Sequence, residues 1–107
     1  MQLYGKHIIA GDFSKEGNNG FYGINPADGN ELPVEFHEAT HEEVERAVQQ
    51  AEVAFQHYRK VSAKERAHFL ERIGTEIMEL GDELIHRCEK ETGLPQQRLI
   101  GERARTV

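Results

Sequence analysis

The sequence has no tryptophan, and its 107 residues include only one cysteine and three prolines. Cys88 therefore cannot form an internal disulfide, and since small secreted proteins usually carry several, we expect a reducing, cytoplasmic location. No apolar run reaches the roughly 18 residues that cross a bilayer, and the start lacks a signal-peptide pattern, so no membrane partner is expected. The net charge of −6, with 13 basic and 19 acidic residues, argues against nucleic-acid binding.

The recognisable nucleotide-binding loops are also missing. Gly17–Gly20 has neither the dinucleotide-fingerprint nor the P-loop spacing, and the pattern after it is that of a strand instead of a helix. We therefore assign no cofactor-binding residue in this chain. There is no internal repeat, and the size allows one small hydrophobic core.

Residues 1–39 are predicted to form strands and turns. The apolar run His7–Ala10 precedes the loop Lys15–Gly20, whose Asn and Gly residues accept the positive φ angles of tight turns, and this order indicates a hairpin. Asn25–Gly29 contains a proline and an Asp-Gly pair, which predict a second turn. Leu32–Phe36 then alternates apolar and polar residues as a half-buried strand does, although its proline restricts it to an edge or a strand start.

Residues 40–107 are predicted to be helical, because two capping boxes precede amphipathic segments. Thr40 with Glu43, and Ser62 with Glu65, have the spacing in which a hydroxyl and a carboxylate satisfy each other's backbone amides. Apolar residues follow both boxes at three- and four-residue intervals, as on one helical face. The first set is Val44, Ala47, Val48, Ala51, Phe55 and Tyr58, and the second is Ala67, Leu70, Ile73, Ile77, Leu80 and Leu84.

Three glycine and proline signals divide the rest of the helical region. Gly81-Asp82 predicts either a break between two helices or a kink in one. Gly93 is suited to the left-handed position after a helix, and Pro95 can open the next helix, which we expect to be cut short at Val107. The predicted fold is α+β: a β-hairpin region followed by three or four helices, forming a single partial domain over residues 1–107.

Two motifs could be taken for metal or nucleophile sites, and we assign neither. His37-Glu38-Ala39-Thr40-His41 matches the H-E-x-x-H string of zinc peptidases, but a cap at Thr40 places the histidines on either side of a strand-to-helix corner. Cys88 lies mid-helix beside acidic residues, which would raise the pKa of a thiol, and we interpret it as a packing residue. The remaining histidines lack ligand spacing: His7, His57, His68 and His86.

The last predicted helix carries a cluster of charges. Its members could form a recognition surface, but pairing of Arg98 with Glu102 at i,i+4 is the simpler interpretation. Arg103 and Arg105 complete the cluster.

The ordered signals resemble the opening of an aldehyde dehydrogenase over nearly the whole chain. They are Asn25-Pro26-Ala27-Asp28-Gly29, the Thr40 box with Val44, Ala47, Val48 and Ala51, the Ser62 box with Arg66-Ala67, Phe69-Leu70 and Ile73, and finally Glu91-Thr92-Gly93. Within the family, Glu91–Pro95 and Arg98–Thr106 look most like the α-ketoglutaric semialdehyde branch, close to the NADP-dependent fatty aldehyde dehydrogenases. Other branches commonly have Trp in place of Tyr58 and Lys in place of Leu94.

The resemblance implies an α/β parent enzyme with a Rossmann-like cofactor domain that uses NAD or NADP, contacts its aldehyde substrate through the missing domains, and forms a homo-oligomer. Family members use a cysteine thiolate, an oxyanion site and a glutamate base. None of these maps onto residues 1–107, so we assign no catalytic, cofactor-binding or metal residue and expect this segment alone to be inactive. The alternative is a free-standing helical interaction module that binds a partner through its apolar faces.

Overall fold

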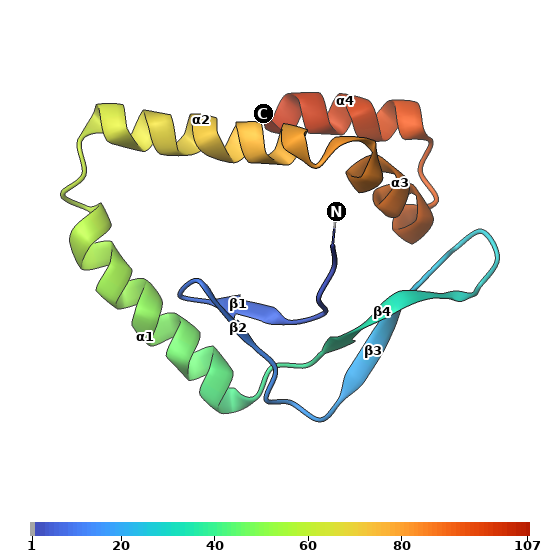
Figure 1. Ribbon diagram of the computed structural model, residues 1–107, viewed down its shortest axis with the longest axis horizontal. Helices are drawn as coiled ribbons and strands as arrows, with labels where there is room; N and C mark the ends of the chain where they lie inside the picture. Colours follow the sequence, from blue (N-terminus) through green and yellow to red (C-terminus); the bar gives the residue numbers. More distant parts are fainter. Residues whose placement is uncertain (1) are drawn as a thin grey trace. The chain divides into compact units, whose positions relative to one another are not determined.

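The computed structural model describes residues 2–107, so only the first residue of the predicted strand-and-turn region lies outside it. In this part of the chain all strands precede all helices (Figure 1). The elements are β1 His7–Ile9, β2 Asp12–Ser14, β3 Gly20–Ile24, β4 Glu31–His37, α1 His41–Tyr58, α2 Ala63–Glu79, α3 Gly81–Thr92 and α4 Gln96–Thr106. The predicted α+β order, with four helices after the strands, is confirmed for the described residues.

Two compact units make up most of this structure, and each is described by itself. Leu3–Tyr22 and Pro33–Val61 form the first, called here the α1 unit. Gly23–Leu32 and Ser62–Val107 belong to the second, called the α2–α4 unit.

The first hairpin of the α1 unit turns at a different place from the one predicted. β1 pairs with β2 in antiparallel register, with Ile9 opposite Asp12. The two residues between them, Ala10 and Gly11, have φ angles of 54° and 92°, the left-handed geometry that suits a two-residue hairpin turn. The predicted turn at Lys15–Gly20 is wrong, because that segment leads from β2 to β3 of another sheet and none of its residues has a positive φ.

The second hairpin joins β3 to β4 as a two-stranded sheet, and its turn is where the sequence predicts it. The amide of Asn25 donates to the Asn30 carbonyl at 2.9 Å, and that of Gly29 donates to the Asn25 carbonyl at 2.8 Å. Gly29 supplies the positive φ of 75°. Either strand of a two-stranded sheet is an edge strand, which accommodates Pro33 within β4.

Both predicted capping boxes are present. At the start of α1, the amide of Glu43 donates to Thr40 Oγ1 at 3.1 Å while Glu43 Oε2 accepts from the Thr40 amide at 2.9 Å. At the start of α2, the Glu65 amide donates to Ser62 Oγ at 3.2 Å, and Glu65 Oε2 accepts from the Ser62 amide at 3.1 Å. Each box satisfies two backbone amides that would otherwise lack a helical partner.

The α2–α4 unit contains two breaks that follow the predicted signals. α2 and α3 are separate helices, and Gly81 at the junction has a φ of 62°. Its carbonyl accepts a hydrogen bond of 2.8 Å from Arg103 Nη1 of α4. Gly93 ends α3 in the left-handed conformation with a φ of 68°. The buried apolar side chains of the described residues, all in this unit, are Leu32, Ile85 and Leu99.

Candidate functional site

The structure separates the two histidines of the H-E-x-x-H string. His37 is the last residue of β4 and is buried, whereas His41 is the first residue of α1 and its side chain is 81% exposed. Glu45 Oε1, on the same helix, lies 3.9 Å from His41 Nε2. The predicted strand-to-helix corner is thus confirmed. Within residues 2–107, no group of three or more histidine, cysteine or acidic side chains is placed to hold a metal ion.

Cys88 lies on α3 and is half-buried. It lines a groove of about 330 Å³ among α2, α3 and α4, whose walls are mostly apolar. Its neighbours in that lining include Ile77, Leu84 and Leu99. This is the environment of a packing residue, in agreement with the sequence interpretation.

The charged residues of α4 make two kinds of contact, ion pairs within the helix and a hydrogen bond to the backbone outside it. Glu102 accepts from Arg105 and lies 3.9 Å from Arg98 Nε, so the predicted i,i+4 ion pair is present. These side chains are solvated, and such pairs contribute little to stability. Arg103 instead reaches the Gly81 carbonyl in the α2–α3 junction, so its role is structural.

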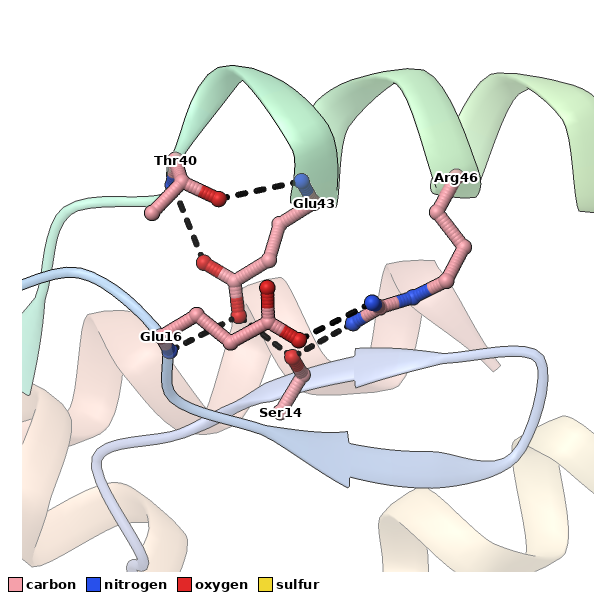
Figure 2. Close-up of polar contacts among 5 residues, drawn as sticks. All are labelled: Ser14, Glu16, Thr40, Glu43 and Arg46. Atoms are coloured by element: carbon pink, nitrogen blue, oxygen red, sulfur yellow. Dashed lines mark hydrogen bonds and ion pairs between the residues drawn. The ribbon is translucent and has the colours of Figure 1, made fainter.

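The most enclosed polar group of the described chain is the carboxylate of Glu43, which is 0% exposed. Three donors from three segments converge on it (Figure 2). The Ser14 hydroxyl at the end of β2 donates to Oε1, which also accepts from the Glu16 amide at 3.1 Å. The Thr40 amide donates to Oε2 at 2.9 Å. A buried charge is stable only with such partners, because burial removes the water that would otherwise solvate it.

Arg46, one helical turn further along α1, completes what we call the Glu43 cluster, formed by Ser14, Glu16, Thr40, Glu43 and Arg46. Its Nη1 lies 2.9 Å from Glu16 Oε1, and its Nη2 donates to Ser14 Oγ at 2.7 Å. Ser14 Oγ therefore accepts from Arg46 and donates to Glu43 (Figure 2). The cluster joins β2 and the loop after it to the first two turns of α1.

Hydrogen bonding lowers the pKa of Glu43 from 4.5 to about 2. The donors responsible are, in order, the Ser14 hydroxyl, the Thr40 amide and the Glu16 amide, and burial opposes them. A carboxylate that is ionised at neutral pH and closed to solvent cannot serve as a general acid or as a nucleophile for a substrate. The Glu43 cluster is therefore a positioning site that sets the hairpin on α1.

Sequence reasoning found Glu43 only as a capping residue and missed its long-range partners. In the sequence, Ser14 lies 29 residues before Glu43 and 32 residues before Arg46. A capping glutamate followed three residues later by an arginine is a common surface pattern, and nothing local distinguishes this one.

The lowered pKa predicts how stability depends on pH. Because the carboxylate is stabilised in the folded state, its contribution is complete above about pH 4.5 and is lost as the pH falls towards 2. We expect the difference in melting temperature between the native protein and Glu43→Gln to be largest above pH 5 and to shrink below pH 4. Melting curves of both proteins at intervals of half a pH unit measure this. A difference in melting temperature that does not change with pH would show that the ionised carboxylate of Glu43 does not stabilise the fold.

Comparison with known proteins identifies the family. The model of the aldehyde dehydrogenase family matches residues 13–107. The chain belongs to this family. The match includes the last two residues of β2, all of β3 and β4, and all four helices of the described chain. Every member of the Glu43 cluster lies within it. The family resemblance of the sequence is thereby confirmed.

Three relatives carry dehydrogenase names. The chain is 43% identical over its full length to alpha-ketoglutaric semialdehyde dehydrogenase 2 of Azospirillum brasilense. It is 37% identical, over 96% of its length, to alpha-ketoglutaric semialdehyde dehydrogenase of Acinetobacter baylyi. A 1-pyrroline-5-carboxylate dehydrogenase of Staphylococcus epidermidis is 30% identical over 81% of the chain. The chain spans about a fifth of the length of these relatives, 21%, 20% and 17% respectively. No solved structure gives a significant match.

Proposed function

We propose that this chain is the amino-terminal segment of an NAD(P)-dependent aldehyde dehydrogenase that oxidises α-ketoglutaric semialdehyde. The observation that carries the proposal is the 43% identity, over the whole chain, to a protein with that activity in its name. The second relative, of the same name, supports it. The relatives named for 1-pyrroline-5-carboxylate are 30% identical, which favours the first substrate over the second.

In this reaction the aldehyde and a water molecule give the carboxylic acid, while NAD or NADP takes the hydride and a proton is released. The nucleophile, the base and the cofactor site of the family are expected in the parts of the parent protein outside residues 1–107. The role proposed for this segment is structural. Its Glu43 cluster fixes the first hairpin on α1, so that both can pack as one piece against the rest of the enzyme.

The exposed apolar side chains of the described residues support a segment that packs against further protein. Val48 of α1 is 62% exposed and Leu70 of α2 is 63% exposed, although both belong to the apolar faces predicted from the sequence. Exposed faces of this kind mark contact surfaces. They are equally required by the alternative, a free-standing interaction module, so the reaction must be tested directly.

A homo-oligomeric, cytoplasmic parent is part of the same proposal. No helix within residues 2–107 has the length and apolar character needed to cross a membrane.

The experiment compares the full-length gene product with the 107-residue chain in aldehyde-dependent reduction of NAD and of NADP. We expect turnover by the full-length protein only, with kcat/KM for α-ketoglutaric semialdehyde at least about tenfold above that for 1-pyrroline-5-carboxylate, because a site matched to one substrate discriminates against another shape. Activity of the short chain, freed of host enzymes, would overturn the placement of the chemistry. A full-length protein inactive on every aldehyde would favour the interaction module.

A further inference from the structure

Asn19 is followed by Gly20 at the point where the chain enters β3. Both residues are exposed. Asparagine is a thermolabile residue, because the nitrogen of the following peptide bond can attack its side-chain carbonyl carbon. A glycine at the next position leaves that nitrogen unhindered, since it has no Cβ. Among the asparagines of the sequence, the attack therefore meets the least steric resistance at Asn19.

The other three asparagines of the sequence are poorer candidates for this reaction. Asn25 precedes Pro26, whose nitrogen carries no hydrogen and cannot act as the nucleophile. Asn18 and Asn30 precede residues with side chains, which crowd the attacking nitrogen. Asn18 is also exposed, so it provides an internal comparison for Asn19 in the same molecule.

The structure places Asn19 against Glu38, the first residue after β4. The main-chain carbonyl of Asn19 accepts from the Glu38 amide at 2.9 Å, and Asn19 Nδ2 donates to Glu38 Oε2 at 3.2 Å. Two residues earlier, a Cβ added at Gly17 would stand 2.0 Å from the Glu38 carbonyl oxygen. The segment before β3 thus contacts the amide, the carbonyl and the carboxylate of one residue, which leads into the Thr40 cap of α1. A chemical change at Asn19 therefore acts on the connection between β4 and α1.

We propose that Asn19 is a self-modification site, at which the Gly20 amide displaces the side-chain nitrogen and the protein slowly converts to aspartyl and isoaspartyl forms. The Gly20 nitrogen loses its proton and bonds to Asn19 Cγ, the Cγ–Nδ2 bond breaks, and the released nitrogen leaves as ammonia with that proton. Water then opens the cyclic imide, giving aspartate when it adds at Cγ and isoaspartate when it adds at the main-chain carbonyl carbon. The reaction needs only these residues and water, so it is independent of the enzyme activity proposed above.

The two products affect the contacts with Glu38 to different degrees. Both carry a carboxylate in place of the amide that donates to Glu38 Oε2. The like charges repel each other, although exposure to water weakens this effect. Isoaspartate also lengthens the main chain by a CH₂ group and turns the former main-chain carbonyl into the free carboxylate, so the strand no longer fixes the acceptor of the Glu38 amide. The isoaspartyl form is therefore the one that loosens the connection most.

The first test follows ammonia release and peptide modification in the full-length protein during incubation at mildly alkaline pH. Fragment-ion mass spectrometry distinguishes conversion at Asn19 from conversion at Asn18. We expect Asn19 to convert at least about tenfold faster, because only Asn19 is followed by a residue without a Cβ. Equal rates at the two asparagines, or no conversion at Asn19, overturn the proposal.

The second test measures the structural consequence. The isoaspartyl form is separated from the unmodified protein by chromatography, and hydrogen exchange of the Glu38 amide is compared between them. We expect exchange to be about fivefold faster in the isoaspartyl form, as for the loss of one hydrogen bond. Asn19→Asp measures the charge without the longer main chain, and Asn18→Asp is the matched control for the same charge at the neighbouring position. The expected order of exchange rates is isoaspartyl form, Asn19→Asp, then Asn18→Asp. An isoaspartyl form that exchanges no faster than the unmodified protein would show that the contacts of Asn19 do not hold Glu38.

Discussion

Replacing Glu43 by glutamine lowers the melting temperature of the full-length protein by on the order of 5 °C, because a neutral amide cannot satisfy the donors that meet at this site. The carboxylate offers Oε1 to the Ser14 hydroxyl and the Glu16 amide, and Oε2 to the Thr40 amide. Glutamine keeps one oxygen and turns an NH₂ group towards the remaining donor. The change leaves a buried donor unpaired without altering the volume of the side chain.

The matched control is Glu45→Gln, two residues away on the same helix. The Glu45 side chain is 56% exposed and lies 3.9 Å from His41, so this change alters charge by the same amount in a solvated place. We expect its effect on the melting temperature to be within about 1 °C. Hydrogen exchange of the amides at the start of α1 gives an independent measurement, and faster exchange only in Glu43→Gln is expected. Equal effects of the two substitutions would show that the Glu43 cluster does not hold the hairpin.

Replacing Gly5 by alanine destabilises the α1 unit by about 3 kcal/mol, because the new side chain meets the backbone of β4. A Cβ at this position would stand 1.9 Å from the Glu35 carbonyl oxygen and 3.2 Å from Val34 Cγ1. Gly5 also has a φ of 61°, which alanine adopts with strain. Relief requires the segment before β1 to move away from β4. The local opening free energy of the β1 and β2 amides, measured by hydrogen exchange, reports the loss.

Gly11→Ala separates the two causes. Gly11 has a φ of 92°, but nothing lies within 4 Å of a Cβ added there. An alanine at this position is therefore strained by its backbone angle but meets no neighbouring atom. We expect the opening free energy in the same measurement to fall by about 1 kcal/mol. If Gly5→Ala were no more harmful than Gly11→Ala, the close approach to Glu35 would be of no importance for stability.

The features predicted correctly are those encoded by neighbouring residues. Thr40 and Glu43 satisfy each other's amides within one helical turn, and Gly93 ends α3 through its own freedom at positive φ. The turn before β4 needs only Asn25 through Asn30. Three or four helices could therefore be predicted, with only the break at Gly81 left open, and the family recognised, without any knowledge of tertiary contacts.

The features that sequence reasoning missed depend on distant residues or on unfavourable backbone angles. Ala10 occupies a φ of 54° in the first hairpin turn, and Val34, a β-branched residue, has a φ of 84° within β4. Local preferences argue against both, since such residues rarely take left-handed angles. The burial of Glu43 was hidden for a different reason, because its hydroxyl partner is 29 residues away and the intervening sequence contains no signal of the contact.

The hydrogen bond between Arg103 and the Gly81 carbonyl can form only late in synthesis of the chain, because its two partners lie 22 residues apart. The ribosome delivers Gly81 22 residues before the guanidinium that occupies its carbonyl, and nascent chains leave the tunnel at roughly 5–20 residues per second. For roughly one to a few seconds at that rate, the Gly81 carbonyl lacks its partner from α4 and is open to water. A pause in translation just before Arg103 would prolong this interval.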